Sequence, residues 1–255
     1  MTLTAPTDDC PYKTCDGSGI ILVRDLEKGI EFGKFCACRD KLITNSKIQF
    51  ADIPEEFRDL KIGSFKTSCY ENDISRTRAA MAKKAATNFV KEFEIMRKHG
   101  KGLYMYGHTK GSGKTRLAVS IANALMNVHK VSAKFITTPN LLEEIKAAFR
   151  SDSEYSSSEL INVMKRVPVL VLDDIGTEKP SDWVNETFYS ILNDRMTGNK
   201  VTIFTSNCTI EELHHDDRIK NRIEKMAIPI WFPEESMRTK IAKQENEDLQ
   251  MILFK

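Results

Sequence analysis

The chain has 255 residues, of which 41% are apolar and 29% charged, and its 38 Lys and Arg against 36 Asp and Glu leave a formal net charge of +2. This composition supports a folded core and excludes a disordered polyelectrolyte. No apolar run reaches the roughly 18 residues that a membrane span needs. The first ten residues, MTLTAPTDDC, also have neither the basic nor the apolar region of a secretory signal. We therefore expect a cytoplasmic protein of one or two domains with no membrane partner.

The first 50 residues contain two close pairs of cysteines on either side of a predicted β-hairpin. The hairpin strands are expected at 20–23 and 29–35, and the pairs are Cys10 with Cys15 and Cys36 with Cys38. Four thiolates form a typical tetrahedral Zn²⁺ site, and disulfides are rare in a reducing compartment. So short a segment has little core of its own, so a metal would stabilise it. We expect zinc here, with free or redox thiols as the alternative.

After the cysteine-rich segment the sequence predicts a connector, followed by strands that alternate with helices. The motif IPEEFRDLKIGSF lies in a predicted linker, 51–74, and a polar loop is expected at 151–158. The predicted strands are 103–106, 133–137, 169–172, 201–205 and 228–232. The predicted helices are 75–99, 114–127, 140–150 and 181–196, two short ones around Glu211 and Asn221, and a last one from Glu234. Such alternation predicts an α/β domain over 75–255 with a parallel sheet, which binds ligands at the carboxyl ends of its strands.

A glycine-rich loop lies between the strand 103–106 and the next helix. It reads Gly107-His108-Thr109-Lys110-Gly111-Ser112-Gly113-Lys114-Thr115. Glycines let backbone N–H groups approach a phosphate, and the following helix N-terminus adds donors and positive partial charge. Lys114 is expected to reach the β- and γ-phosphates of a nucleotide, and Thr115 to bind Mg²⁺. His108 occupies the place of the first glycine in G-x-x-x-x-G-K-[ST], so the start of the loop is expected to be longer or differently turned. The predicted binding residues are Gly107, Lys110, Gly111, Ser112, Gly113, Lys114 and Thr115.

Acidic and polar side chains follow the later strands. Asp173 and Asp174 end a buried apolar strand, and Asn207 ends the next one. Asp173 is expected to hold Mg²⁺, and Asp174 to deprotonate the attacking water. Asn207 would position that water, although Ser-Asn is also ordinary turn chemistry.

Three arginines are candidates for binding the terminal phosphate. Arg218 and Arg222 precede the last strand and could act on the nucleotide of a neighbouring subunit, and Arg238 could act within its own chain. A solvated helix face is the alternative for each. Residues 71–110 contain nine Lys and Arg against four Asp and Glu, which is the most basic stretch. Phosphate contacts by such residues would depend strongly on salt, but a solvated helix face is the simpler interpretation.

Several further segments resemble the AAA+ ATPases of the DnaC/DnaI replicative-helicase loader family. They are LDDIGTEK at 172–179, Trp183, IFTSN at 203–207, NRI at 221–223 and ESMR at 235–238, with the cysteine cluster followed by IPEEFR at 53–58. The resemblance implies a sheet of order 5-1-4-3-2, a reduced C-terminal lid, ATP with Mg²⁺, and a zinc module at 1–50 that docks on a DnaB-type hexameric helicase. It also implies self-association when ATP is bound and binding of single-stranded DNA. In the family pattern Asn207 is sensor 1, Arg222 the finger candidate and Arg238 sensor 2.

The resemblance implies an ATP-dependent loader that delivers a replicative helicase onto single-stranded DNA. Many AAA+ proteins have glutamate where this chain has Asp174, so we expect slow ATP hydrolysis, more a switch than a motor. One alternative is an IstB-type transposition helper ATPase, which would not need the zinc module. The other is a nucleotide-gated DNA-binding adaptor with little hydrolysis.

Overall fold

The computed structural model describes residues 2–26, 28–39, 50–150 and 157–254. The chain divides into two compact units, Met1–Phe50 and Ala51–Lys255, which are considered separately. No helix in the described ranges is long and apolar enough to cross a membrane.

The first unit is built around the expected hairpin. Strands β1 (Ile20–Arg24) and β2 (Glu31–Phe35) pair antiparallel, with Ile20 opposite Phe35 and Arg24 opposite Glu31. At the open end of the hairpin the N–H of Cys36 donates to the carbonyl of Gly19 at 2.9 Å. The pairing thus brings the second cysteine pair back to the first, and the hairpin prediction is confirmed.

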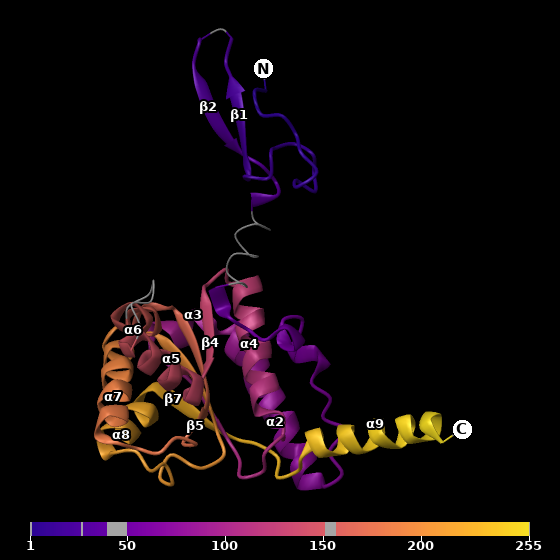
Figure 1. Cartoon of the computed structure of the whole chain (residues 1–255), viewed down its shortest axis with the longest axis vertical. Coiled ribbons are helices and arrows are strands. Elements are labelled where there is room, and N and C mark those ends of the chain that lie inside the picture. The colour runs from indigo at the N-terminus through magenta and orange to yellow at the C-terminus, as the bar shows by residue number, and fades with distance from the viewer. Residues whose placement is uncertain (1, 27, 40–49, 151–156, 255) are drawn as a thin grey trace. The chain divides into compact units, whose positions relative to one another are not determined.

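The second unit contains a five-stranded parallel sheet (Figure 1). Its strands are β3 (Gly102–Tyr106), β4 (Ala133–Thr137), β5 (Val169–Ile175), β6 (Val201–Ser206) and β7 (Ala227–Trp231). Their order across the sheet is β4-β5-β6-β3-β7, and every pair is parallel. Numbered within this sheet, the order is 5-1-4-3-2, as expected. The carboxyl ends of all five strands consequently meet at one edge.

Helices cover the two faces of this sheet because strand side chains point alternately to opposite sides. Tyr104, Leu172 and Phe204 pack in one core cluster with α5 (Thr138–Arg150), α6 (Ser157–Arg166), α7 (Asp182–Thr197) and α8 (Asp217–Met226). The helix α4 (Lys114–Val128) contacts β3, β4, β5 and β6 and also α2 (Asp73–Lys91). After β7 the described chain has one further helix, α9 (Met237–Leu253), which matches the expected reduction of the lid.

Four sequence predictions are wrong in detail. The helix expected at 75–99 breaks at Glu92 into α2 and α3 (Phe93–Lys98), which lets the buried Phe93 ring pack against Phe89 and His129. A turn replaces the helix expected around Glu211. Helix α9 begins at Met237, where Ser236 caps it, and not at Glu234. The loop expected at 151–158 lies partly outside the described residues, and its last two residues begin the unexpected helix α6.

The segment 51–74 belongs to the second unit and packs on the rest of it. The amide of Asn123 on α4 donates to the carbonyls of Phe57 and Leu60 at 3.0 and 3.1 Å. The hydroxyl of Tyr70 donates to the carbonyl of Ser112 at 2.8 Å. A segment expected as a linker is therefore held against α4 and the glycine-rich loop.

Candidate nucleotide-binding site

The glycine-rich loop runs from the end of β3 to the start of α4, and its backbone needs glycine at two positions. Gly111 and Gly113 have φ angles of 75° and 95°. A Cβ at Gly111 would lie 2.8 Å from Ser236 Oγ, and one at Gly113 would lie 2.9 Å from a ring carbon of Phe65. Gly113 is the N-cap of α4 and gives no side-chain cap, so the first-turn N–H groups of α4 are open to an anion.

Lys114 is a buried cation at the base of this loop, with its side chain turned back onto the loop backbone. Its ammonium donates to the carbonyls of Gly107 at 2.9 Å and Thr109 at 3.0 Å, and the residue is 5% exposed. Burial lowers the pKa of Lys114, although the charges of Asp174, Glu234 and Asp173 counteract this. Among the described residues no carboxylate lies within 4.0 Å of the ammonium. A phosphate would supply the missing counter-charge.

A cleft of about 500 Å³ opens over the loop, a size suited to a small organic ligand. Residues 110–116 line it together with Asp174, Asn207 and Arg238. The structure thus brings these three predicted residues to the phosphate loop from three different segments. The apolar side chains of Phe57 and Ile241 also line the cleft.

The two acids occupy a β-bulge at the end of β5. The register with β6 shifts between Leu172 and Ile175, and Asp174 has a φ of 56°. An extra bulged residue changes the strict alternation of side chains. Asp173 is buried and accepts from the Thr205 hydroxyl at 2.6 Å, whereas Asp174 faces the cleft.

The environment of Asp173 fits a divalent cation. Burial raises the pKa of Asp173 to about 6, with a further rise from the charge of Asp174, whereas hydrogen bonds from Thr205 and Thr115 lower it. Thr115 therefore lies beside Asp173, as expected for a pair that holds Mg²⁺. A cation would relieve the cost of ionising a buried carboxylate.

Arg238 lies in the first turn of α9, next to the loop. The N–H groups of Met237 and Arg238 donate to the carbonyl of Gly111 at 2.9 and 3.3 Å. Arg222 and Arg218 lie elsewhere, over the ring of Tyr189 at 4.0 and 4.8 Å. Neither arginine is among the described residues that line the cleft over the loop.

Comparisons with known proteins agree with this geometry. Residues 66–229, more than half of the chain, match the family described as IstB-like ATP binding protein. The chain belongs to this family. It is 36% identical over 140 residues to the replicative helicase loader DnaI of Bacillus subtilis (strain 168), a match that covers 54% of this chain and 43% of DnaI. It is 27% identical over 146 residues to the replicative helicase loader DnaC of Escherichia coli (strain K12), covering 56% of this chain and 58% of DnaC.

The fold of this IstB-like domain also matches a solved structure. The crystal structure of DnaI aligns with a TM-score of 0.58 and 35% identity, over 71% of this chain and 94% of that one. The resemblance to the DnaC/DnaI family and the α/β fold are therefore confirmed. The sequence matches to DnaI and DnaC cover 43% and 58% of those proteins, which is less than two thirds of the length of either.

Replacing Asp173 with asparagine is expected to stabilise the metal-free IstB-like domain at pH 7. Because the folded pKa of about 6 exceeds the ordinary 3.8, the penalty for ionising Asp173 is absent below pH 3.8 and complete above about 6. Asparagine keeps the acceptor for the Thr205 hydroxyl without the charge, so the free energy of unfolding should increase by about 1 to 3 kcal/mol at pH 7. Denaturant unfolding with and without the substitution at pH 7 and about pH 4 measures it. Equal stabilities at pH 7 would contradict a buried carboxylate whose pKa is raised in the folded protein.

The four N-terminal cysteines form a separate candidate metal centre. All four ligand atoms lie within 4.8 Å of one another, with Cys10 Sγ 3.7 Å from Cys36 Sγ and Cys15 Sγ 3.4 Å from Cys38 Sγ. Sulfurs on a tetrahedral Zn²⁺ with bonds of about 2.3 Å lie about 3.8 Å apart, so the donor set fits zinc. Hydrogen bonds, the largest from the backbone of Thr14, lower the pKa of Cys10 to about 5, while burial raises that of Cys38. A cation would favour the thiolate form of all four.

Some residues near the nucleotide site were not predicted from the sequence. Glu234 and Tyr70 hold the loop, and no local pattern distinguishes them. Two further side chains lie outside this site: Cys69 is exposed, and His215 is buried against Glu178.

Proposed function

We propose that this protein is an ATPase that binds ATP with Mg²⁺ in the cleft over residues 110–116. The observation that carries the proposal is the convergence of Lys114, Thr115, Asp174, Asn207 and Arg238 on one cleft, with the buried Asp173 beside Thr115. Membership of an ATP-binding family supports it.

The roles of the side chains follow from their positions. Lys110, Gly111, Ser112 and Gly113 line the phosphate cradle, and Lys114 contributes its charge to the β- and γ-phosphates. Gly107 does not line the cleft, and its carbonyl holds the Lys114 ammonium. Thr115 and Asp173 would hold Mg²⁺, which would supply positive charge to the same phosphates. Asp174 accepts the proton of the attacking water, and Asn207 orients that water. Arg238, and Arg222 from a neighbouring subunit, stabilise the charge of the transition state.

Asp174→Asn is expected to slow ATP turnover by about 100-fold or more while leaving ATP affinity nearly unchanged. Asparagine tolerates the positive φ of this position, so the bulge should be kept. Steady-state phosphate release and equilibrium titration with a fluorescent ATP analogue measure the two quantities. Turnover equal to that of the wild type would favour the nucleotide-gated adaptor.

We further propose that ATP binding and hydrolysis switch a loader that delivers a DnaB-type hexameric helicase onto single-stranded DNA. The relatives DnaI and DnaC, both named replicative helicase loaders, support this role. In this proposal the zinc-binding module at 1–50 docks on the helicase, and the ATPase part binds DNA and self-associates with ATP. Co-sedimentation of the full chain with a DnaB-type helicase and single-stranded DNA, with and without ATP, tests it.

The family description keeps the transposition helper as a second candidate. The matched residues 66–229 contain the cleft but not the cysteine cluster, so that match alone does not distinguish the two functions. Helicase capture that is lost with Cys36→Ser would exclude the transposition helper. No capture by the wild-type chain would exclude the loader.

A further inference from the structure

The phosphate loop of this chain is one residue longer than the common pattern. Residues 108–112 separate Gly107 from Gly113, whereas four residues separate the two glycines in G-x-x-x-x-G-K-[ST]. His108 is the first residue of the longer loop, and the two carbonyls that hold the Lys114 ammonium, those of Gly107 and Thr109, flank it. His108 therefore lies between the two residues whose carbonyls hold the Lys114 ammonium.

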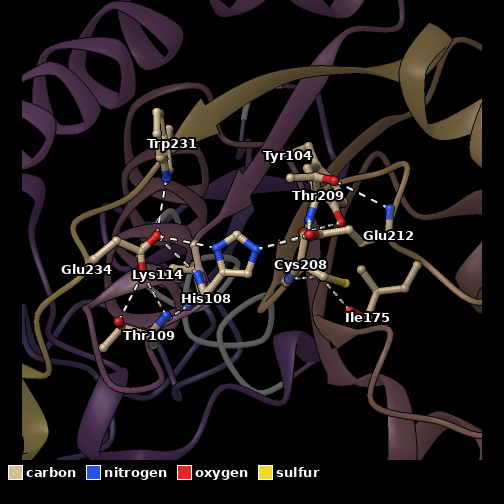
Figure 2. A network of polar contacts seen from close by, with 12 residues as sticks. Tyr104, His108, Thr109, Lys114, Ile175, Cys208, Thr209, Glu212, Trp231 and Glu234 are labelled. Carbon is tan, nitrogen blue, oxygen red and sulfur yellow. Dashed lines mark hydrogen bonds and ion pairs between the residues drawn. The ribbon is translucent and has the colours of Figure 1, made fainter.

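The imidazole of His108 lies between two carboxylates from distant parts of the chain, as Figure 2 shows. Its Nε2 is 3.1 Å from Glu212 Oε2, and its Nδ1 is 3.6 Å from Glu234 Oε1. The backbone strengthens the second contact. The N–H of His108 donates to Glu234 Oε1 at 3.3 Å, and the N–H and hydroxyl of Thr109 both donate to Oε2 at 2.9 Å.

Glu212 connects His108 to the loop after β6. The carboxylate of Glu212 accepts from the N–H of Thr209 at 2.8 Å. In the same turn, the hydroxyl of Tyr104 donates to the carbonyl of Cys208 at 3.0 Å. This turn begins at Asn207, the sensor 1 candidate. His108 is thus linked through one side chain to the segment that would position the attacking water.

Glu234 connects His108 to the segment that leads into α9. The Trp231 indole donates to Glu234 Oε1 at 3.2 Å, and Arg238 follows in the first turn of the helix. The N–H of Met237 also donates to the carbonyl of Gly111. The segment that leads into α9 therefore contacts the phosphate loop both at its start and further along, at Gly111. His108 and Glu234 form the contact at the start of the loop.

Both carboxylates that face His108 are held in the ionised form. Hydrogen bonds from Thr209 and His108 lower the pKa of Glu212. Burial raises the pKa of Glu234, but hydrogen bonds from Thr109 and Trp231 outweigh it and hold the pKa below its usual value. A neutral imidazole has one N–H and can donate to only one of two carboxylates, whereas an imidazolium donates to both. The other charged residues of the loop 107–115 are Lys110 and Lys114, and both ammonium groups repel an imidazolium.

We propose that His108 is a positioning residue for the nucleotide, whose imidazolium joins the start of the phosphate loop to the two segments that carry Asn207 and Arg238. The inference rests on the proposed ATP site. It adds that binding at the loop is coupled to both segments through the Glu212–His108–Glu234 contacts.

A double-mutant cycle on the full chain tests this coupling, with the Kd for a fluorescent Mg-ATP analogue as the measured quantity. His108→Gln and Glu212→Gln should each raise the Kd by about threefold to tenfold, as expected for partly exposed charged contacts. The Kd of the double variant should be no larger than the larger of the two single-variant Kd values. His214→Gln, which removes an exposed imidazole two residues after Glu212 in the chain, is the matched control and should leave the Kd unchanged.

The pH dependence separates positioning by charge from a merely structural role. The ratio of the His108→Gln Kd to the wild-type Kd should be largest in acidic buffer, where an imidazole is charged, and should fall toward one in alkaline buffer, where an imidazole is neutral. Taking the ratio at each pH cancels the titration of the nucleotide itself.

Additive effects in the cycle, or a Kd ratio that does not change with pH, would overturn the proposal. Lys114→Ala in the same assay keeps this failure distinct from failure of the ATP site. If Lys114→Ala loses binding and His108→Gln does not, only the role of His108 is refuted. If Lys114→Ala still binds, the ATP site itself is refuted.

Discussion

Replacing Lys114 with alanine is expected to weaken ATP binding by about 100-fold or more, because it removes a buried cation from the phosphate-binding loop. The ammonium already lies among the loop carbonyls and has no carboxylate partner within 4.0 Å among the described residues. An incoming phosphate would gain this charge without first breaking an ion pair. Equilibrium titration with a fluorescent ATP analogue gives the change in Kd directly.

Two further variants make this result interpretable. Lys114→Met keeps most of the aliphatic side chain, so a loss of affinity shared with Lys114→Ala reflects the charge and not a cavity. Lys84→Ala removes an exposed lysine from α2 and should bind ATP like the wild type. Unchanged affinity in both Lys114 variants would contradict the assignment of the loop.

Removing zinc is expected to unfold the first unit and leave the second unit able to bind ATP. Within the described residues of the first unit, the one buried cluster consists of the four cysteines with Ile21 packed against them, whereas Ile20, Leu22 and Phe35 of the hairpin are exposed. A metal bound by four thiolates would therefore supply most of the folding free energy of this unit. We expect the wild-type chain to contain one zinc ion. In Cys36→Ser we expect the metal to be lost and the first 50 residues to be cleaved by protease.

The matched control is Cys69→Ser, which alters an exposed cysteine outside the cluster. It should retain one zinc per chain and the protease resistance of the wild type. A wild-type chain that contains no zinc after expression in zinc-supplemented medium would contradict the site. A Cys15–Cys38 disulfide that is present in cell extract prepared under reducing conditions would indicate redox thiols instead of a zinc site.

Local patterns were enough to predict the strands and the loop. The β4 strand, Ala133–Thr137, has the predicted bounds, and β3 differs by one residue, because short apolar runs between turn residues are read directly from the sequence. The GSGKT run predicts a loop before a helix because only glycine permits its backbone angles.

Features that depend on distant contacts could not be predicted in this way. Helix α6 is ten residues long, which is short for a helix to form alone. It is fixed by the buried Met164 and by Arg195, whose guanidinium donates to the carbonyls of Met164 and Val167. The bulge at Asp174 depends on pairing with β6, so residue spacing does not reveal it.

The contacts of His108 show the same limit at the candidate site. The sequence pattern marked His108 as a departure from the usual loop, but its partners Glu212 and Glu234 lie more than 100 residues away in the chain. Only the order of the strands brings these three segments to one edge of the sheet.

The most direct measurement is a crystal structure of the full chain with a non-hydrolysable ATP analogue and Mg²⁺. We expect the phosphates over residues 111–115, with the Lys114 ammonium against the β- and γ-phosphates and the metal beside Thr115 and Asp173. A nucleotide bound elsewhere, or no nucleotide at saturating concentration, would contradict the account.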